Sequence, residues 1–336
     1  MFKLTPFAAI ALCALAGAQA GRSAHPKPQP VAQKLTLGTP VQIGTLAIVP
    51  IVSTVPLARE KYRTLAEATK LGLVEIVELP GGQEVNSLEV RNKGDLPLLL
   101  FAGELLLGGK QDRIVGKDSI VPAKGRRDVP VFCVEHGRWS GSTNFRGGDT
   151  FVPSAVRQAA VQGGRQDQVW DRVAKANADV GVAPSTGTFR ATVDSPKVRG
   201  AADHLMALVN ARFKPTAGTV GVICWMNGRI HSADLFANGG LFSASRAKLF
   251  RSYALDVQLL SSPKATPVDA RACKAFLAAI VAAKRGAMEG DAFGHGVRLM
   301  DKAVAGYESG GAKFRRPFDA GGASAGFAHG TYTPGK

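Results

Sequence analysis

The sequence predicts an α+β fold with a β-rich, sandwich-like N-terminal half that contains one short helix, followed by a helical segment, a β-hairpin and two amphipathic helices. Three observations support this class. Strand and helix periodicities occur together, but without regular β-α-β alternation or an internal repeat. Glycine (39) and proline (19) are plentiful and aromatic residues make up only 7%, as in turn-rich proteins that contain β-structure. The 336 residues are 45% hydrophobic, which is enough for a sizeable core.

The first twenty residues predict an export signal. A single lysine, Lys3, precedes an apolar stretch at 7–17, and small residues at Ala18 and Ala20 form an A-x-A cleavage pattern. We therefore expect a signal peptide over 1–20, cleavage near Ala20, and an exported (periplasmic or extracellular) protein. The proline-rich segment that follows, 21–33, is predicted to be a linker.

We expect a single α+β domain over 34–320, whose β-rich half covers 34–139. A short helix is predicted in this half, because Thr64 and Glu67 form a capping box and Gly72 can end the helix. Strands are predicted at 34–52 (two strands), 73–79, 86–107 (two strands around a turn) and 118–135 (two strands around a turn).

The mixed helical half covers 151–320 and follows a polar, glycine-rich loop expected at 140–154. Asp167 is predicted to cap the first helix of this half, and Thr266 is predicted to cap the last. Helices are expected at 167–180, 199–213, 245–260 and 266–285.

A β-hairpin interrupts these helices. Asn227–Gly228 lies between two alternating segments, and this dipeptide favours a type I′ turn. Short strands are expected near the C-terminus, and 321–336 is predicted to be a flexible tail.

The net charge of +16 comes from 42 Lys and Arg against 26 Asp and Glu. Such a charge attracts anions, but the basic residues are scattered, with clusters only at 124–127 and 313–316. No nucleic-acid motif is recognisable, so we predict no nucleic-acid partner. No apolar run reaches the roughly 18 residues of a membrane span, so no integral membrane segment is expected. The oligomeric state is left open.

The sequence predicts no cofactor and no metal site. It has no Walker A loop, no G-x-G-x-x-G and no H-E-x-x-H. Its six histidines are dispersed, and only Cys133 and His136 lie close together, which is too few ligands for zinc. Three cysteines lie beyond the signal peptide, Cys133, Cys224 and Cys273, so they cannot all form disulfides within the chain. We expect all three to be buried, and whether two of them form a disulfide is left open. A thiol enzyme using Cys133 and His136 would need an exposed sulfur.

Two stretches at strand ends carry the candidate chemistry, "GELLLGGKQDRIV" (103–115) and "CVEHGRW" (133–139). We expect the first to form a strand, a glycine turn and a second strand that delivers its polar residues toward the second stretch. In a binding site the arginines would hold an anion, a glutamate would orient an arginine or act as general base, and the tryptophan would stack on a ring. The candidate residues are Glu104, Lys110, Gln111, Arg113, Glu135, Arg138 and Trp139.

The same stretches resemble a known family. "LEVRNKGDLPLLL", "GELLLGGKQDR" and "VPAKGRRDVPVFCVEHGRW", with "VGVICWMNGRIHSADLF" and "KLFRSYALDV" further on, are similar to the family associated with ADP-ribosylglycohydrolase (ARG) and rhodanese-phosphatase-superfamily proteins. The resemblance covers about 35–258, and its most specific parts are G-E-x5-K-Q-x-R and C-V-E-x-G-R-W. It implies an association with NAD or ADP-ribose metabolism. Asp112 departs from the family pattern, in which a neutral polar residue is common.

Two hypotheses follow. In the first, an exported protein binds a small anionic or nucleotide-like ligand in one pocket lined by Glu104, Gln111, Arg113, Glu135 and Arg138, with Lys110 and Trp139 as secondary contacts; whether it is an enzyme is left open. In the alternative, the protein is a non-enzymatic envelope module that binds a partner through its basic surface, and the same polar residues are internal ion pairs. A concave pocket holding both arginines would favour the first hypothesis, and a filled, paired cluster the second.

Overall fold

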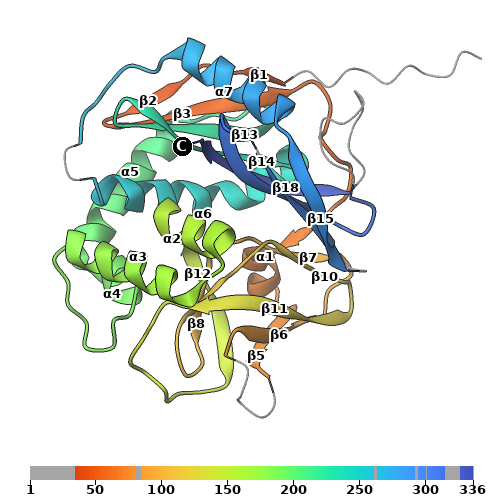
Figure 1. Cartoon of the computed structure of the whole chain (residues 1–336), viewed down its shortest axis with the longest axis vertical. Helices are drawn as coiled ribbons and strands as arrows, with labels where there is room; N and C mark the ends of the chain where they lie inside the picture. Colours follow the sequence, from red (N-terminus) through yellow and green to blue (C-terminus); the bar gives the residue numbers. More distant parts are fainter. Residues whose placement is uncertain are drawn as a thin grey trace, which may run out of the picture.

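The computed structural model describes residues 35–79, 85–260, 263–291, 294–299, 301–314 and 326–335. The predicted signal peptide (1–20) and linker (21–33) lie outside the described residues. The described part has the predicted α+β, β-rich fold, in which a large sheet lies at one end of the molecule and a closed barrel at the other (Figure 1).

The large sheet joins the two halves of the chain. Its strands run in the order β1-β3-β13-β14-β18-β17-β16-β15, with β2 paired to β3. They are β1 (Leu35–Leu37), β2 (Val41–Ile43), β3 (Leu46–Ser53), β13 (Thr219–Met226), β14 (Arg229–Phe236), β15 (Arg285–Asp291), β16 (Gly294–Leu299), β17 (Val304–Gly310) and β18 (Phe327–Pro334). Residues 34–52 therefore hold three strands instead of two, and β3 pairs antiparallel with β13 from the second half.

The predicted hairpin is confirmed. β13 pairs antiparallel with β14, and both turn residues have positive φ, Asn227 at 53° and Gly228 at 80°, as a type I′ turn requires. The tail prediction is wrong for residues 327–334. This segment is β18, which lies inside the sheet between β14 and β17 and has buried side chains from Phe327 to His329.

The barrel closes in the order β11-β6-β5-β12-β8-β9, and a small sheet of β10, β7 and β4 lies beside it. The bounds are β4 (Arg63–Thr64), β5 (Val74–Glu78), β6 (Ser87–Asn92), β7 (Leu98–Leu100), β8 (Glu104–Gly108), β9 (Arg113–Val115), β10 (Ser119–Val121), β11 (Gly125–Cys133) and β12 (Asn144–Phe151). The loop predicted at 140–154 is therefore wrong, because it contains β12. The alternation of apolar and polar residues expected of a strand is missing because a glycine, Gly148, occupies one inward position. A Cβ on this buried residue would lie 3.1 Å from Leu105 Cβ.

The helices are α1 (Leu65–Lys70), α2 (Ser154–Gln158), the π-helix η1 (Ala159–Gly163), α3 (Gln166–Asp179), α4 (Arg190–Asp194), α5 (Pro196–Arg212), α6 (Gly239–Gln258) and α7 (Ala270–Ala282).

The capping box of Thr64 and Glu67 is confirmed. The other two predicted caps are wrong. Asp167 lies in the first turn of α3, after the N-cap. Asp269 caps α7, because its carboxylate accepts hydrogen bonds from the first turn of the helix, whereas Thr266 accepts one from the Trp225 indole.

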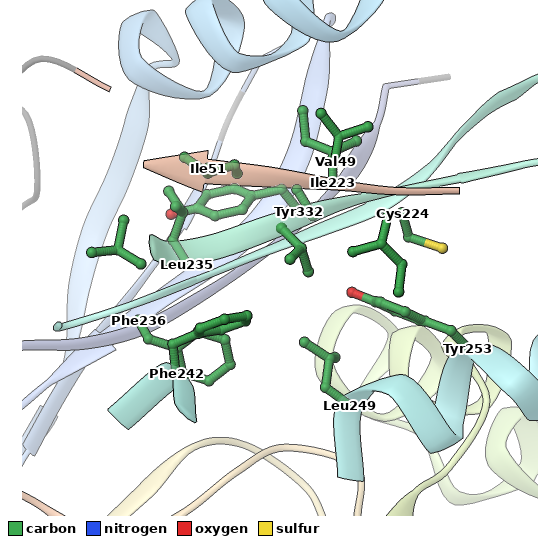
Figure 2. Close-up of a cluster of buried hydrophobic side chains, with 14 of the residues drawn as sticks. Val49, Ile51, Ile223, Cys224, Leu235, Phe236, Phe242, Leu249, Tyr253 and Tyr332 are labelled. Atoms are coloured by element: carbon green, nitrogen blue, oxygen red, sulfur yellow. The ribbon is translucent and has the colours of Figure 1, made fainter. Parts of the chain in front are cut away.

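Helices cover both faces of the large sheet, with α7 on one side and α5 and α6 on the other (Figure 1). Figure 2 shows the main core, where Phe242, Leu249 and Tyr253 of α6 pack against the sheet beside Cys224 and Phe236. A second cluster of buried leucines and valines fills the barrel. No helix in the described part of the chain is long and apolar enough to cross a membrane.

Cys133, Cys224 and Cys273 are buried, as expected, and all three are free thiols. Burial raises the pKa of the Cys133 thiol, an effect that the nearby Arg113 only partly offsets. Cys133 is 2% exposed, so the exposed sulfur that a thiol enzyme would need is not found there.

Candidate functional site

The stretch from 103 to 115 forms the predicted strand, glycine turn and strand. β8 and β9 pair antiparallel, with Leu106 opposite Arg113. Gly109 has φ +54°, and a Cβ there would fall 2.1 Å from the Phe145 ring. This glycine therefore lets the turn pack closely on β12, and its role is one of packing.

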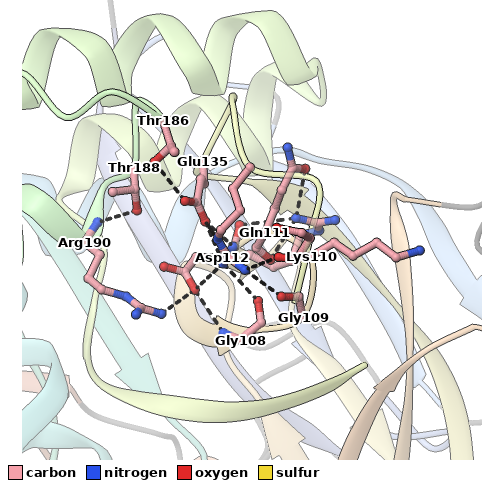
Figure 3. A network of polar contacts seen from close by, with 12 residues as sticks. Gly108, Gly109, Lys110, Gln111, Asp112, Glu135, Thr186, Thr188 and Arg190 are labelled. Atoms are coloured by element: carbon pink, nitrogen blue, oxygen red, sulfur yellow. Dashed lines mark hydrogen bonds and ion pairs between the residues drawn. The ribbon is translucent and has the colours of Figure 1, made fainter. Parts of the chain in front are cut away.

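The two predicted polar stretches meet (Figure 3). The Asp112 amide donates a 3.1 Å hydrogen bond to Glu135 Oε2, and the Arg138 guanidinium forms a 2.7 Å ion pair with the same carboxylate. The Gln111 side chain donates to the His136 carbonyl over 3.2 Å. The turn between β8 and β9 is therefore bound directly to the segment that follows β11.

This cluster is filled by its own side chains. Gln111, Arg113 and Glu135 are at most 4% exposed. Arg113 donates to the backbone and side-chain oxygens of Gln111, and burial lowers the pKa of its guanidinium. Burial would raise the pKa of Glu135, but hydrogen bonds from Arg138, the Asp112 amide and Thr186 outweigh burial and lower it. A carboxylate held by three donors is a weak base, so the cluster has the geometry of the alternative hypothesis, internal pairing.

Glu104 does not join this cluster, so the prediction of one pocket lined by both glutamates is wrong. Glu104 begins β8, whereas the turn lies at the other end of that strand. Its Oε1 lies 2.5 Å from Lys248 Nζ, and its Oε2 accepts a 3.1 Å hydrogen bond from the Phe101 amide. Glu104 and Gln111 are close in the sequence, but β8 separates them, because Glu104 begins the strand and Gln111 lies in the turn beyond its other end.

The two secondary candidates lie at the edge of the cluster or outside it. Lys110 is half-exposed, and its ammonium lies 3.5 Å from Glu78. Trp139 is 60% exposed.

A cavity that the sequence did not predict lies between α1, α4, α6, β8 and β12. It has a volume of about 520 Å³. The first predicted stretch (103–115) reaches its wall through two paired cations. Glu104 holds Lys248, and Asp112 Oδ1 accepts a 2.6 Å hydrogen bond from Arg190. Lys248 and Arg190 both line the cavity.

The lining is basic. Its cations are Lys70, Arg146, Arg190 and Lys248, and its acids are Asp149 and Asp194. Each acid is already paired outside the lining, Asp149 with Arg251 at 3.4 Å and Asp194 with Arg199 at 2.5 Å. Among the described residues, Lys70 and Arg146 have no ion-pair partner. The lining therefore suits an anion. Leu105, Leu107 and Val193 add an apolar surface.

A bulge in β12 forms part of the cavity wall. While β8 passes from Leu106 to Glu104, β12 passes from Gly147 to Phe151, so β12 carries two extra residues. Gly147 and Gly148 of this bulge line the cavity and place backbone there instead of side chains. The four cations of the lining come from four separate segments of the chain, so their positions in the sequence do not predict that they meet. The glycine pair is the one signal in the sequence that points to a close approach of the backbone at this wall.

A family model described as "ARG and Rhodanese-Phosphatase-superfamily-associated Protein domain" matches residues 34–316. No curated protein and no solved structure matches the chain.

Proposed function

The chain belongs to the family of ARG and rhodanese-phosphatase-superfamily-associated proteins, and from this premise we propose that it binds a small anionic or nucleotide-like ligand. The binding site is the 520 Å³ cavity between α1, α4, α6, β8 and β12. Its volume lies within the range of small-molecule sites, about 300–1,000 Å³. The family association makes ADP-ribose and related nucleotides the first ligands to test.

One observation carries the proposal. Two buried carboxylates from the β8–β9 hairpin, Glu104 and Asp112, each hold a cation at the wall of the same cavity. Glu104 and Asp112 are each 1% exposed. A carboxylate fixed in the core limits the rotamers of the long side chain that it binds, which lowers the entropy lost when that side chain contacts a ligand. In this proposal Glu104 orients a lysine, whereas the sequence predicted a glutamate that orients an arginine or acts as general base.

The remaining groups divide by chemistry. Arg146 and Lys70 supply charge that no described acid neutralises, and an arginine can contact phosphate through two parallel hydrogen bonds. Asp149 and Asp194 can accept hydrogen bonds from ligand hydroxyls. Leu105 and Val193 offer an apolar surface to a base or sugar ring. Phosphate, hydroxyls and a ring together describe a nucleotide.

Export is part of the proposal and rests on the sequence of residues 1–20. The ligand would then be met in the periplasm or outside the cell. Expression of the full chain in a bacterial host, followed by fractionation and N-terminal sequencing, should yield an exported protein that begins at Gly21. An uncleaved protein that stays in the cytoplasm would refute export without bearing on the ligand.

A second candidate function has one observation in its favour. The paired cluster of Gln111, Arg113, Glu135 and Arg138 is filled, as a binding module with structural ion pairs requires. In that case the basic surface would bind an acidic partner, and the cavity would show no affinity for small anions.

The test is calorimetric titration of residues 21–336 with ADP-ribose, AMP and pyrophosphate. Arg146→Ala should weaken the binding of at least one of them by about tenfold, the effect of roughly one charge-assisted contact. Arg172→Ala is the matched control, because Arg172 is also exposed and has no described ion-pair partner but does not line this cavity. Equal losses in the two variants, or no binding by the wild-type protein, would refute the anion site.

A further inference from the structure

A buried chain of alternating charges lies between the barrel and the large sheet. Asp118 Oδ2 lies 2.8 Å from His329 Nδ1, His329 Nε2 lies 3.3 Å from Asp234 Oδ1, and that oxygen lies 3.0 Å from Arg157 Nη1. The four side chains are each at most 4% exposed. None of the four lines the anion cavity.

Each residue of the loop from Phe101 to Gly103 packs against or hydrogen-bonds to one of these four side chains. The Phe101 ring contacts the His329 ring edge to face, with centroids 5.0 Å apart. The Ala102 amide donates a 2.8 Å hydrogen bond to Asp118 Oδ1. Gly103 has φ +81°, and a Cβ there would lie 2.9 Å from Arg157 side-chain carbons. Only glycine allows the backbone to approach Arg157 this closely.

The next residue connects this loop to the anion cavity. Glu104 Oε2 accepts the Phe101 amide, and Glu104 Oε1 holds Lys248 at the cavity wall. One carboxylate therefore binds the loop with one oxygen and the lysine with the other. Lys248 has no other described ion-pair partner, so its position depends on Glu104.

We propose that the buried charges of Asp118, His329, Asp234 and Arg157 are positioning residues for the anion cavity. They hold the loop 101–103, the loop orients Glu104, and Glu104 orients Lys248. The inference rests on the proposed ligand site for its functional meaning. A buried ion pair is weak evidence for stability in itself, whereas here three consecutive loop residues each contact one charged member. These contacts therefore fit a role in orienting the loop.

The ligand-binding test is a double-mutant cycle with pyrophosphate as the probe. Asp118→Asn should weaken binding about tenfold in the wild-type background and less than about twofold in the Lys248→Ala background, because the effect passes through Lys248. The substitution removes a negative charge, so a general electrostatic effect would strengthen anion binding instead. The matched cycle pairs Asp118→Asn with Lys70→Ala, and there the two fold-changes should multiply. An equal effect of Asp118→Asn in the wild-type and Lys248→Ala backgrounds would overturn the inference.

A second measurement needs no ligand. Acetylation by acetic anhydride, followed by mass spectrometry, reports how well each lysine is held in its ion pair. Lys248 should react several-fold faster in Asp118→Asn than in the wild-type protein, and Lys70 should react at the same rate in both. If pyrophosphate fails to bind the wild-type protein while Lys248 still becomes reactive, the proposed function fails and the positioning role stands. Unchanged reactivity of Lys248 overturns the positioning role whatever the binding result.

A milder variant covers the case in which Asp118→Asn does not fold. The Ser309 hydroxyl donates a 2.6 Å hydrogen bond to Asp118 Oδ2, and Ser309→Ala removes this donor while leaving all four charges in place. It should raise the reactivity of Lys248 and weaken pyrophosphate binding by about two- to threefold. As with Asp118→Asn, the effect on binding should be smaller in the Lys248→Ala background. A folded Ser309→Ala protein with wild-type values for both would count against the inference.

Discussion

Asp112 accepts a 2.6 Å hydrogen bond from Arg190, a residue that follows it by 78 positions in the chain. The same Asp112 oxygen accepts the Gly108 amide over 2.9 Å. Asp112 is 1% exposed, so it joins the β8–β9 turn to the first residue of α4. The charge of Asp112 therefore has a defined partner in α4.

Asp112→Ala should therefore destabilise the fold. The substitution leaves the Gly108 amide and Arg190 without their acceptor. Because the Arg190 side chain stays partly solvated, the cost in the free energy of unfolding is about 1–3 kcal/mol. Urea denaturation followed by circular dichroism measures this change. Asp171→Ala is the control, because Asp171 is exposed and has no described partner, and it should change stability by less than about 0.5 kcal/mol. Equal effects of the two substitutions would contradict the role given to Asp112.

The buried histidine predicts a dependence of stability on alkaline pH. Burial alone would lower the pKa of His329, but Asp118 and Asp234 outweigh burial and raise it to about 9. Because the folded-state value exceeds the unfolded value of about 6.5, protonation stabilises the fold fully below pH 6.5, and this stabilisation is lost as the pH rises through 9. The loss is on the order of 3 kcal/mol.

Urea denaturation between pH 6 and 10 should show this loss in the wild-type protein. His329→Gln cannot titrate at this position, so its stability curve should be flatter over the same range. Parallel curves for the two proteins would show that His329 does not account for the pH dependence.

Asp118 and Asp234 act in the opposite direction. Burial opposes their ionisation, but His329, together with Arg157 in the case of Asp234, lowers the pKa of both carboxyls. Their contribution is therefore present above the unfolded value of about 3.9 and is lost as the pH falls below it. Acid unfolding should begin at a higher pH in His329→Gln, in which the carboxylates have lost one cation, and an unchanged acid midpoint would argue against this pairing.

Gly103 and Gly200 form a matched pair of substitutions. Gly103→Ala places a Cβ at positive φ and 2.9 Å from Arg157, so it should lower the free energy of unfolding by about 1–3 kcal/mol. Gly200 lies inside α5, and a Cβ there meets no atom within 4 Å. Gly200→Ala should therefore stabilise the protein by about 0.5–1 kcal/mol through its helix propensity. Thermal unfolding distinguishes the two signs, and destabilisation of similar size by both would refute the close contact at Gly103.

The N-terminus of α7 gives a direct test of the corrected cap. Asp269→Ala should cost about 1 kcal/mol, because the carboxylate accepts the amides of Arg271 and Ala272. Thr266→Ala removes the residue that the sequence predicted as cap and should cost less, since the hydroxyl has only a 3.4 Å contact with the Trp225 indole. The reverse order in urea denaturation would restore the original prediction.

Features with a local cause were predictable. The capping box at Thr64 and the turn at Asn227–Gly228 depend on residues within a few positions of each other, and both are confirmed. β18 was missed because an interior strand is covered on both faces, so consecutive residues 327–330 are buried and the period of two disappears. β12 was missed because glycines occupy positions where a sequence pattern needs side chains.

In the candidate site, too, contacts between nearby strands were predictable and contacts between distant segments were not. The meeting of the two polar stretches was predicted, and Glu135 and Arg138 contact the turn as expected. The separation of Glu104 from Glu135 was not predicted, because the partner of Glu104 is Lys248, 144 residues away. Periodicity shows which face of a strand a carboxylate occupies, but the cation that meets it depends on how α6 packs against the barrel.

The place of β18 in the large sheet bears on how the protein is made. β14 ends at Phe236 and β18 begins at Phe327, yet they are neighbours in the sheet, and β17 pairs with the other edge of β18. During synthesis β14 emerges well before β18, so β14 lacks this neighbour and His329 is missing until β18 emerges. Folding of this sheet is therefore completed only after translation of residues 327–334.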